Sequence, residues 1–178
     1  MAWARGTTYC HLAIPILRLL CPTRSRTLPG RSARNYPGCP EPALVAWAVQ
    51  GDLNEISACL SANGMQRVGP NRTERKTAVG DLLVWELFFP IAGSHGARMP
   101  FFIDRLDCPH PAAMNPDAGT FKSIRLRSPD SSGLSCALES VDLEIEVTEG
   151  KPAITVEIES RGLVTLTSPA DTRALSVI

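Results

Sequence analysis

The sequence predicts an α+β fold built from two units with the same order of elements, a strand, a helix and three strands (βαβββ). Each unit opens with an apolar strand, continues with a capped helix, and then alternates apolar and polar residues as half-buried strands do. We expect the first unit at 41–92, a crossover at 93–120, the second unit at 121–170 and a tail at 171–178. The strands should form one curved mixed sheet with the helices on its outer face.

The first unit opens with ALVAWAV, an almost wholly apolar segment from Ala43 that is typical of a buried strand. Asp52 should cap the helix after it, because Glu55 three positions later completes a capping box. Gly64 should end this helix. The apolar stripe of the helix consists of Leu53, Ile56, Cys59 and Leu60.

Three strands are expected after this helix, the first at 65–68 and the other two on either side of Gly80-Asp81. A glycine at the first position of a two-residue loop is typical of a tight hairpin turn. This turn would place Arg75 opposite Glu86, with Thr77 opposite Val84 and Val79 opposite Leu82.

The second unit repeats the order. FKSIRLRS is expected to form a strand from Phe121, and Pro129-Asp130 should open a helix. The strands LEIEVTE and AITVEIES alternate apolar and polar residues, and GLVTLTS closes the unit. The apolar stripe of the helix consists of Leu134, Ala137, Leu138 and Val141.

The last hairpin should have a three-residue loop at 160–162. Only this register pairs Ile158 with Val164 and Val156 with Leu166, so that the apolar residues stay on one face. We expect Gly162 to adopt a left-handed conformation in that loop.

Charge and cysteine usage limit the classes of function. The chain has 18 basic and 18 acidic residues, but residues 1–40 contain six arginines and no acid. The remaining residues carry 12 basic and 18 acidic side chains, which argues against a nucleic-acid-binding surface. We interpret 1–40 as a disordered arm or an organellar presequence, and its apolar run, broken by Pro15 and Arg18, as too short to span a membrane. The six cysteines include no C-x-x-C pair, which favours free thiols and a cytoplasmic location.

Two βαβββ units in one chain resemble the vicinal-oxygen-chelate superfamily of glyoxalases, bleomycin-resistance proteins and dioxygenases. The segments WAVQGDLNEISACLSANGM, LLVWELFFP, PFFID followed by HP, and SRGLVTLTSP resemble its glyoxalase-like domain family, over Ala43 to Pro169. The resemblance implies metal-dependent lyase, isomerase or dioxygenase chemistry on a small oxygenated molecule, with Fe, Mn, Zn or Ni. Family members usually begin with another βαβββ module, so the resemblance also implies that this module is missing here. Arg105 stands where the family usually has tryptophan.

Glu86 and His110 are the candidate catalytic and metal-binding residues. Glu86 is a carboxylate within an apolar strand, and His110 belongs to the His-Pro that the family keeps after PFFID. A neutral imidazole near Asp104 or Asp107 could bind a metal or carry a proton. The alternatives are an ion pair between Glu86 and Arg75, and a purely structural hydrogen bond from His110.

Two ligands are fewer than such a metal usually needs, so a non-catalytic, small-molecule-binding remnant of the family is the alternative function. In the second unit, glutamates and arginines of neighbouring strands should share a face, either as a charged groove or as a solvated surface. These residues are Glu144, Glu146, Glu157, Glu159, Arg125 and Arg127. His95 lies in a glycine-rich loop and is expected to be solvated. Surfaces left uncovered by the missing module predict a homodimer.

Overall fold

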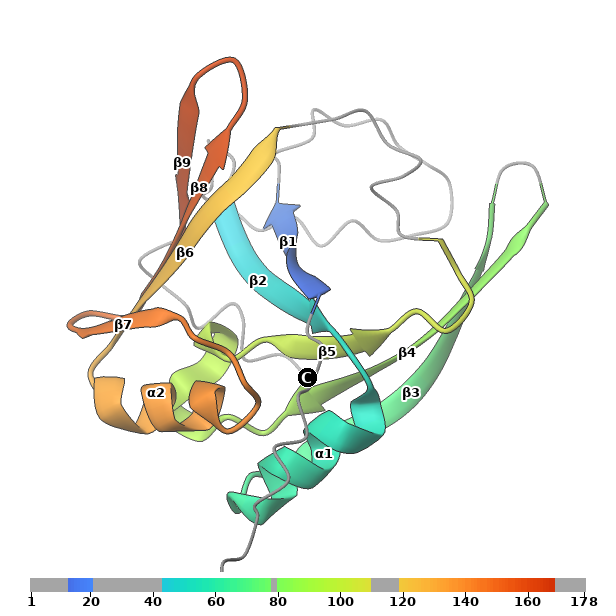
Figure 1. The fold of residues 1–178 in the computed structure, drawn as a ribbon, viewed down its shortest axis with the longest axis horizontal. Helices are drawn as coiled ribbons and strands as arrows, with labels where there is room; N and C mark the ends of the chain where they lie inside the picture. The colour runs from blue at the N-terminus through green and yellow to red at the C-terminus, as the bar shows by residue number, and fades with distance from the viewer. Residues whose placement is uncertain (1–12, 21–42, 78–79, 110–118, 169–178) are drawn as a thin grey trace, which may run out of the picture.

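The structure, a computed structural model, describes residues 13–20, 43–77, 80–109 and 119–168. In this part of the chain the fold is α+β, as the sequence predicts, and it contains two mixed sheets and two α-helices (Figure 1). None of the helices in these ranges is long and apolar enough to cross a membrane.

The elements follow one another in two groups. The first group comprises β1 (Ala13–Leu20), β2 (Ala43–Gln50), α1 (Leu53–Ala62), β3 (Arg67–Lys76), β4 (Leu82–Pro90), the 3-10 helix η1 (Gly93–Arg98) and β5 (Phe101–Asp104). The second group comprises β6 (Thr120–Ser128), α2 (Ser131–Glu139), β7 (Glu146–Glu149), β8 (Ala153–Glu159) and β9 (Leu163–Thr167).

The first sheet has the strand order β1-β2-β5-β4-β3. Its middle strand, β5, is parallel to β2 and antiparallel to β4, and it comes from the segment expected to be part of the crossover at 93–120. That expectation was wrong for Phe101–Asp104, because Pro100 and Pro109 lie outside the strand and leave its hydrogen bonds intact. Phe102 and Ile103 are buried there, between strands on both sides.

The two short strands expected before Gly80 form one strand, β3, with a bulge between Val68 and Asn71. The predicted two-residue turn is wrong. The β3–β4 ladder ends at Lys76 opposite Leu82, which leaves a five-residue loop at 77–81. Two hydrogen bonds close this wider loop: the Thr77 N–H donates to the Asp81 C=O at 2.8 Å, and the Thr77 Oγ1 accepts from the Asp81 N–H at 3.0 Å.

Strand β1 lies within 1–40, the stretch expected to be a disordered arm or presequence. Its backbone pairs antiparallel with β2 and so supplies partners for backbone groups that β2 would otherwise expose at the sheet edge. The other residues of 1–40, and the tail at 171–178, lie outside the described residues.

The second sheet has the strand order β7-β6-β8-β9, with β7 parallel to β6 and the other pairs antiparallel. The predicted register of the last hairpin is confirmed: Ile158 lies opposite Val164, and Val156 lies opposite Leu166. The expectation for Gly162 is wrong, since its φ is not positive. Instead, the Ser160 N–H donates to the Gly162 C=O at 3.0 Å and closes the loop without a left-handed residue.

The two groups differ in how their strands are ordered. In the first, the last strand, β5, lies beside the opening strand of the predicted unit, β2; in the second, the last strand, β9, stays at the edge beside β8. The strands therefore form two separate hydrogen-bonded sheets where one curved sheet was expected, because no ladder joins a strand of one described group to a strand of the other.

Both predicted helix starts are confirmed. The Asp52 carboxylate accepts from the Asn54 N–H at 2.7 Å and from the Glu55 N–H at 3.2 Å. The Asp130 carboxylate accepts from the Gly133 N–H at 2.9 Å. Each cap satisfies backbone donors that the first turn of a helix leaves free.

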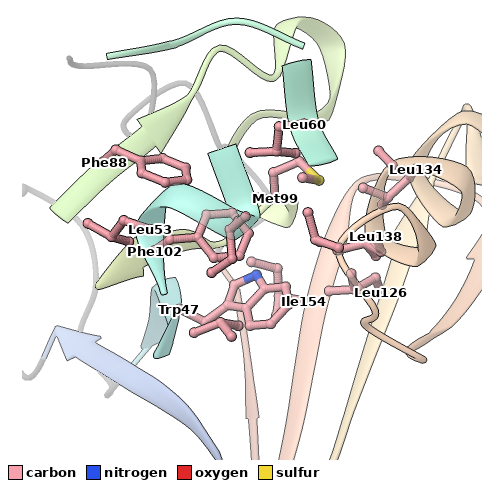
Figure 2. Packing of buried hydrophobic residues seen from close by; sticks show 14 of the residues in the cluster. Trp47, Leu53, Leu60, Phe88, Met99, Phe102, Leu126, Leu134, Leu138 and Ile154 are labelled. Atoms are coloured by element: carbon pink, nitrogen blue, oxygen red, sulfur yellow. The ribbon is translucent and has the colours of Figure 1, made fainter. Parts of the chain in front are cut away.

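A single hydrophobic core contains residues of both helices and both sheets (Figure 2). In Figure 2 the side chains of Trp47, Phe102 and Leu60 lie toward those of Leu138 and Ile154 from the other group. The core cluster comprises Leu44, Trp47, Val49, Leu53, Ile56, Leu60, Phe88, Met99, Phe102, Leu126, Leu134, Ala137, Leu138, Val141, Ile154 and Val156. The helix stripes that the sequence predicts supply seven of these, and Cys59 packs beside them partly buried.

Candidate functional site

Glu86 lies on β4 two residues before the fully buried Phe88, so it is on the side of the sheet that α1 covers. Its carboxylate Oε1 is 3.8 Å from the Arg72 Nη1, and Arg72 is its neighbour across the β3–β4 ladder. The cross-strand ion pair expected for Glu86 is therefore present, but with Arg72 in place of Arg75. The Glu86 side chain remains 33% exposed, so this pair is partly solvated.

Asp104, the last residue of β5, lies opposite Glu86 on the neighbouring strand. Its Oδ1 accepts from the Leu106 N–H at 2.8 Å, and the Cys108 N–H donates to the Arg105 C=O at 2.9 Å. Leu106 adopts a positive φ of 52°, which turns the chain after the strand. This turn directs the following residues back toward β4.

The turn and the β3–β4 hairpin border a hollow of about 440 Å³ that is open to solvent on one side. The Val84 N–H donates to the Cys108 Sγ at 2.9 Å, which holds the turn against β4. Arg72 lines the hollow and is also the residue paired with Glu86, and its side chain is 65% exposed. The lining consists of Arg72, Thr77, Asp81, Leu82, Leu83, Val84, Leu106, Asp107, Cys108 and Pro109.

Arg105 lies in the same turn. Burial of its guanidinium lowers the pKa of Arg105, and the nearby Cys108 thiol acts in the opposite direction with a smaller effect. The Arg105 Nε is buried without a hydrogen-bond partner in the described part of the chain. Arg105 precedes Leu106, which lines the hollow, but is not itself part of the lining.

Of the two predicted site residues, the structure describes Glu86 but not His110. His110 lies outside the described residues, although Pro109 immediately before it lines the hollow. Glu86 and Asp104 bring two carboxylate-bearing positions to neighbouring strands. Within the described ranges, no three His, Cys, Asp or Glu side chains are grouped so that they could hold a metal ion.

Arg72 and Cys108 are the residues of this region that sequence reasoning missed. Arg72 was overlooked because the hairpin register was wrong by three positions, which gave Glu86 a different partner. Cys108 was interpreted only as one of the free thiols, and the N–H donor on β4 that contacts it could not be found without the position of β5.

The polar face of the second sheet is confirmed for part of the predicted set. Arg125 and Ser123 of β6 both contact Glu157 of β8, the former as an ion pair and the latter with its hydroxyl at 3.0 Å. Lys122 pairs with Glu159. The Arg125 side chain is 45% exposed, which fits the solvated-surface interpretation better than an enclosed groove.

His95 was expected to be solvated, but its side chain is only 14% exposed. It lies in η1, and its Nε2 is 3.9 Å from the Asp130 Oδ2 at the start of α2. The neighbouring Arg98 is also buried, and burial lowers its pKa. The contact between His95 and Asp130 connects the first group of elements to the second, and neither residue lines the hollow.

Comparisons with known proteins leave the family open. No protein-family model matches the sequence, and no curated protein matches it. A crystal structure of a hypothetical protein from Staphylococcus aureus matches with a TM-score of 0.48 and 17% sequence identity. The match covers 70% of this chain and 52% of the other, so this chain spans about half the length of that protein.

Proposed function

We propose that the chain is a small-molecule-binding protein of the glyoxalase-like kind, whose ligand binds in the hollow between the β3–β4 hairpin and the turn after β5. The order strand, helix and three strands runs from β2 to β5 in the first group, with η1 before its last strand, and from β6 to β9 in the second, and it supports the glyoxalase-like assignment with two βαβββ modules. The observation that carries the proposal is the position of Arg72, which lines the hollow and is paired with Glu86.

The chemistry of the lining suits a small oxygenated molecule. The Arg72 guanidinium is a fixed-charge donor that can hold two oxygens of a carboxylate or of neighbouring carbonyl and hydroxyl groups. Leu82, Leu83 and Val84 supply apolar contacts, as in most small-molecule sites. In this proposal Glu86 orients Arg72 and does not touch the ligand.

Binding without metal chemistry is the better-supported role. A guanidinium 3.8 Å from the Glu86 carboxylate opposes the approach of a divalent cation to the same oxygens. A cation would have to displace Arg72 before Glu86 could serve as its ligand.

A metal-dependent lyase, isomerase or dioxygenase is the second candidate, favoured by the placement of Glu86 opposite Asp104. His110, which follows a residue of the hollow, would provide the nitrogen ligand for Fe, Mn, Zn or Ni. The metal would polarise a carbonyl oxygen of the substrate, and the carboxylates would hold it. We propose a cytoplasmic location for either function, since the described cysteines Cys59, Cys108 and Cys136 are free thiols.

Isothermal titration of the full chain tests both candidates. Pyruvate serves as a charged probe and methylglyoxal as a neutral one, each titrated into the wild type, Arg72→Ala and Arg75→Ala. Arg75 is the matched control, because it is an exposed arginine of the same strand that does not line the hollow. We expect binding of pyruvate that Arg72→Ala weakens roughly tenfold or more and Arg75→Ala leaves unchanged.

Equal losses of affinity in Arg72→Ala and Arg75→Ala would contradict the assignment of the hollow as the ligand site. So would the absence of binding of both probes. A parallel titration with Mn²⁺, Fe²⁺, Zn²⁺ and Ni²⁺ decides the second candidate. Stoichiometric binding that is lost in both Glu86→Ala and His110→Ala would favour the metal enzyme over simple ligand binding.

A further inference from the structure

Strand β9 forms one edge of the second sheet and is paired only with β8 in the described structure. The β8–β9 hairpin projects from the body of the molecule in Figure 1, with the hairpin loop at its far end. Leu163 is 65% exposed and Val164 is 44% exposed, and these two side chains point to opposite faces of the strand. Within the described ranges, the outer edge of β9 therefore presents unpaired backbone groups between exposed apolar side chains.

Natural proteins usually protect such edges with charges, prolines or bulges. The edge strand β3 has all three protections, since it contains Arg72, Arg75, Pro70 and a bulge. The edge strand β1 contains Pro15. By contrast, β9 has the sequence LVTLT, without charge or proline, and pairs with β8 without a bulge.

The remaining edge strand, β7, is a useful comparison because it is short but charged. Its sequence EVTE begins with Glu146 and ends with Glu149. Antiparallel pairing of β7 with a second β7 would bring Glu146 of one copy opposite Glu149 of the other, and like charges in that position destabilise a sheet. Self-pairing is therefore opposed at β7 and unopposed at β9.

We propose that β9 pairs antiparallel with β9 of a second copy of this chain, about a twofold axis at Thr165. Leu163 then lies opposite Thr167 of the second copy, and no charged side chain falls within the paired segment. The two second sheets join into one continuous sheet across the dimer. A twofold axis makes the contact self-complementary, so it closes at two copies.

Hydrogen bonds hold the C-terminal end of β9 in place, which favours this pairing. Ser168 is 7% exposed, its N–H donates to the Ile154 C=O at 2.8 Å, and its Oγ accepts from the Ile154 N–H at 2.9 Å. The C-terminal end of the edge strand is therefore already attached to β8 before a partner arrives, which lowers the ordering cost of association. Because the contact involves one short strand from each copy, we expect a weak, concentration-dependent dimer.

Sedimentation velocity and hydrogen exchange of the full chain test the proposal. We expect the sedimentation coefficient to rise toward that of a dimer over a roughly hundredfold range of concentration. Thr165→Lys places two like charges at the axis and should weaken the dimer roughly tenfold or more. Ile91→Lys is the matched control, because Ile91 is 53% exposed and lies outside β9, and it should leave the dimer unchanged.

Hydrogen exchange of the wild type keeps the test valid if a variant fails to fold. The amides of Leu163–Thr167 should exchange more slowly at high concentration, while those of β3 should not change. A monomer at every concentration would overturn the proposal. So would a dimer that Thr165→Lys leaves intact, or protection that rises with concentration at β3 and not at β9.

Discussion

The indole Nε1 of Trp47 donates a buried hydrogen bond of 3.1 Å to the backbone C=O of Arg98, 51 residues further along the chain. This bond fastens η1 to β2 and so fixes the start of the segment that leads into β5. Trp47 is 1% exposed and Arg98 is 5% exposed, so water does not compete for the carbonyl.

Replacing Trp47 with phenylalanine should therefore destabilise the protein. Trp47→Phe leaves the buried Arg98 carbonyl without its donor, which should cost about 1–3 kcal/mol. The same replacement at Trp85, which is only half-buried, should cost about 1 kcal/mol or less. Urea unfolding of both variants measures the difference, and equal losses would show that the Trp47 hydrogen bond contributes little.

The shared core predicts that the described part of the chain unfolds in one transition. Leu138→Ala in α2 should cost about 2–5 kcal/mol, and Phe102→Ala in β5 should cost about 3–5 kcal/mol. Each should shift the whole unfolding curve, whether it is followed by circular dichroism or by tryptophan fluorescence, since both residues lie in the same core cluster.

A separate early transition in Leu138→Ala, invisible to Trp47 and Trp85 in the first group, would contradict a common core. Ile91→Ala is the control for side-chain removal as such. Ile91 is 53% exposed, and its truncation should change the free energy of unfolding by about 0.5 kcal/mol or less.

The cap at the start of α1 should make a measurable contribution to stability. Asp52→Ala removes the acceptor for two backbone donors and should cost about 1 kcal/mol. Asp52→Asn keeps a side-chain oxygen at the same position and should cost only a small part of that. Thermal unfolding at constant pH compares the two variants, and equal losses would point to charge rather than to the hydrogen bonds.

Gly69, at the bulge of β3, should not tolerate a side chain. Its φ is 104°, and a Cβ there would lie 2.9 Å from the Leu87 carbonyl oxygen and 3.1 Å from the Phe88 Cβ. Gly80 has a similar φ of 98°, but a Cβ on Gly80 would meet nothing within 4 Å beyond its own chain neighbours. Alanine substitutions at Gly69 and Gly80 therefore distinguish the cost of steric contact, expected only at Gly69, from the cost of backbone strain, expected at both.

We expect Gly80→Ala to cost about 1 kcal/mol from its backbone conformation alone. Gly69→Ala should cost about 1–3 kcal/mol more, because the contacts with β4 must shift. Chemical denaturation of the two variants measures the difference. Similar losses of unfolding free energy in the two variants would mean that β4 accommodates the added methyl group without a measurable loss of stability.

The sequence was sufficient where the determining interactions are local. Both helix caps depend on a carboxylate and backbone donors within three residues. Asp52 was identified as a cap on that basis, and Pro129-Asp130 was identified as the start of the second helix. The β8–β9 register was also predictable, because apolar residues on a short hairpin allow one arrangement, with Ile158 opposite Val164.

Non-local pairing accounts for the features that were not predicted. Four residues, Phe101–Asp104, carry too little periodicity to identify a strand, and their hydrogen-bond partners on β2 and β4 are distant in the sequence. The β3–β4 register failed because hydrogen bonds between Thr77 and Asp81 favour a wider loop than Gly80-Asp81 suggests. Both errors affected the prediction of the site. The pairing of Arg72 with Glu86 follows from the β3–β4 register, and the hollow is formed in part by the turn after β5.

The central position of β5 also decides where this chain can be cut. In the described first sheet, β2 has only β1 and β5 as strand neighbours, and β4 has only β3 and β5. A fragment that stops at the end of β4 would keep two separate hairpins, β1–β2 and β3–β4, with no ladder between their described residues. The four residues of β5 thus join the two hairpins into one sheet. Any fragment intended to fold on its own has to include them.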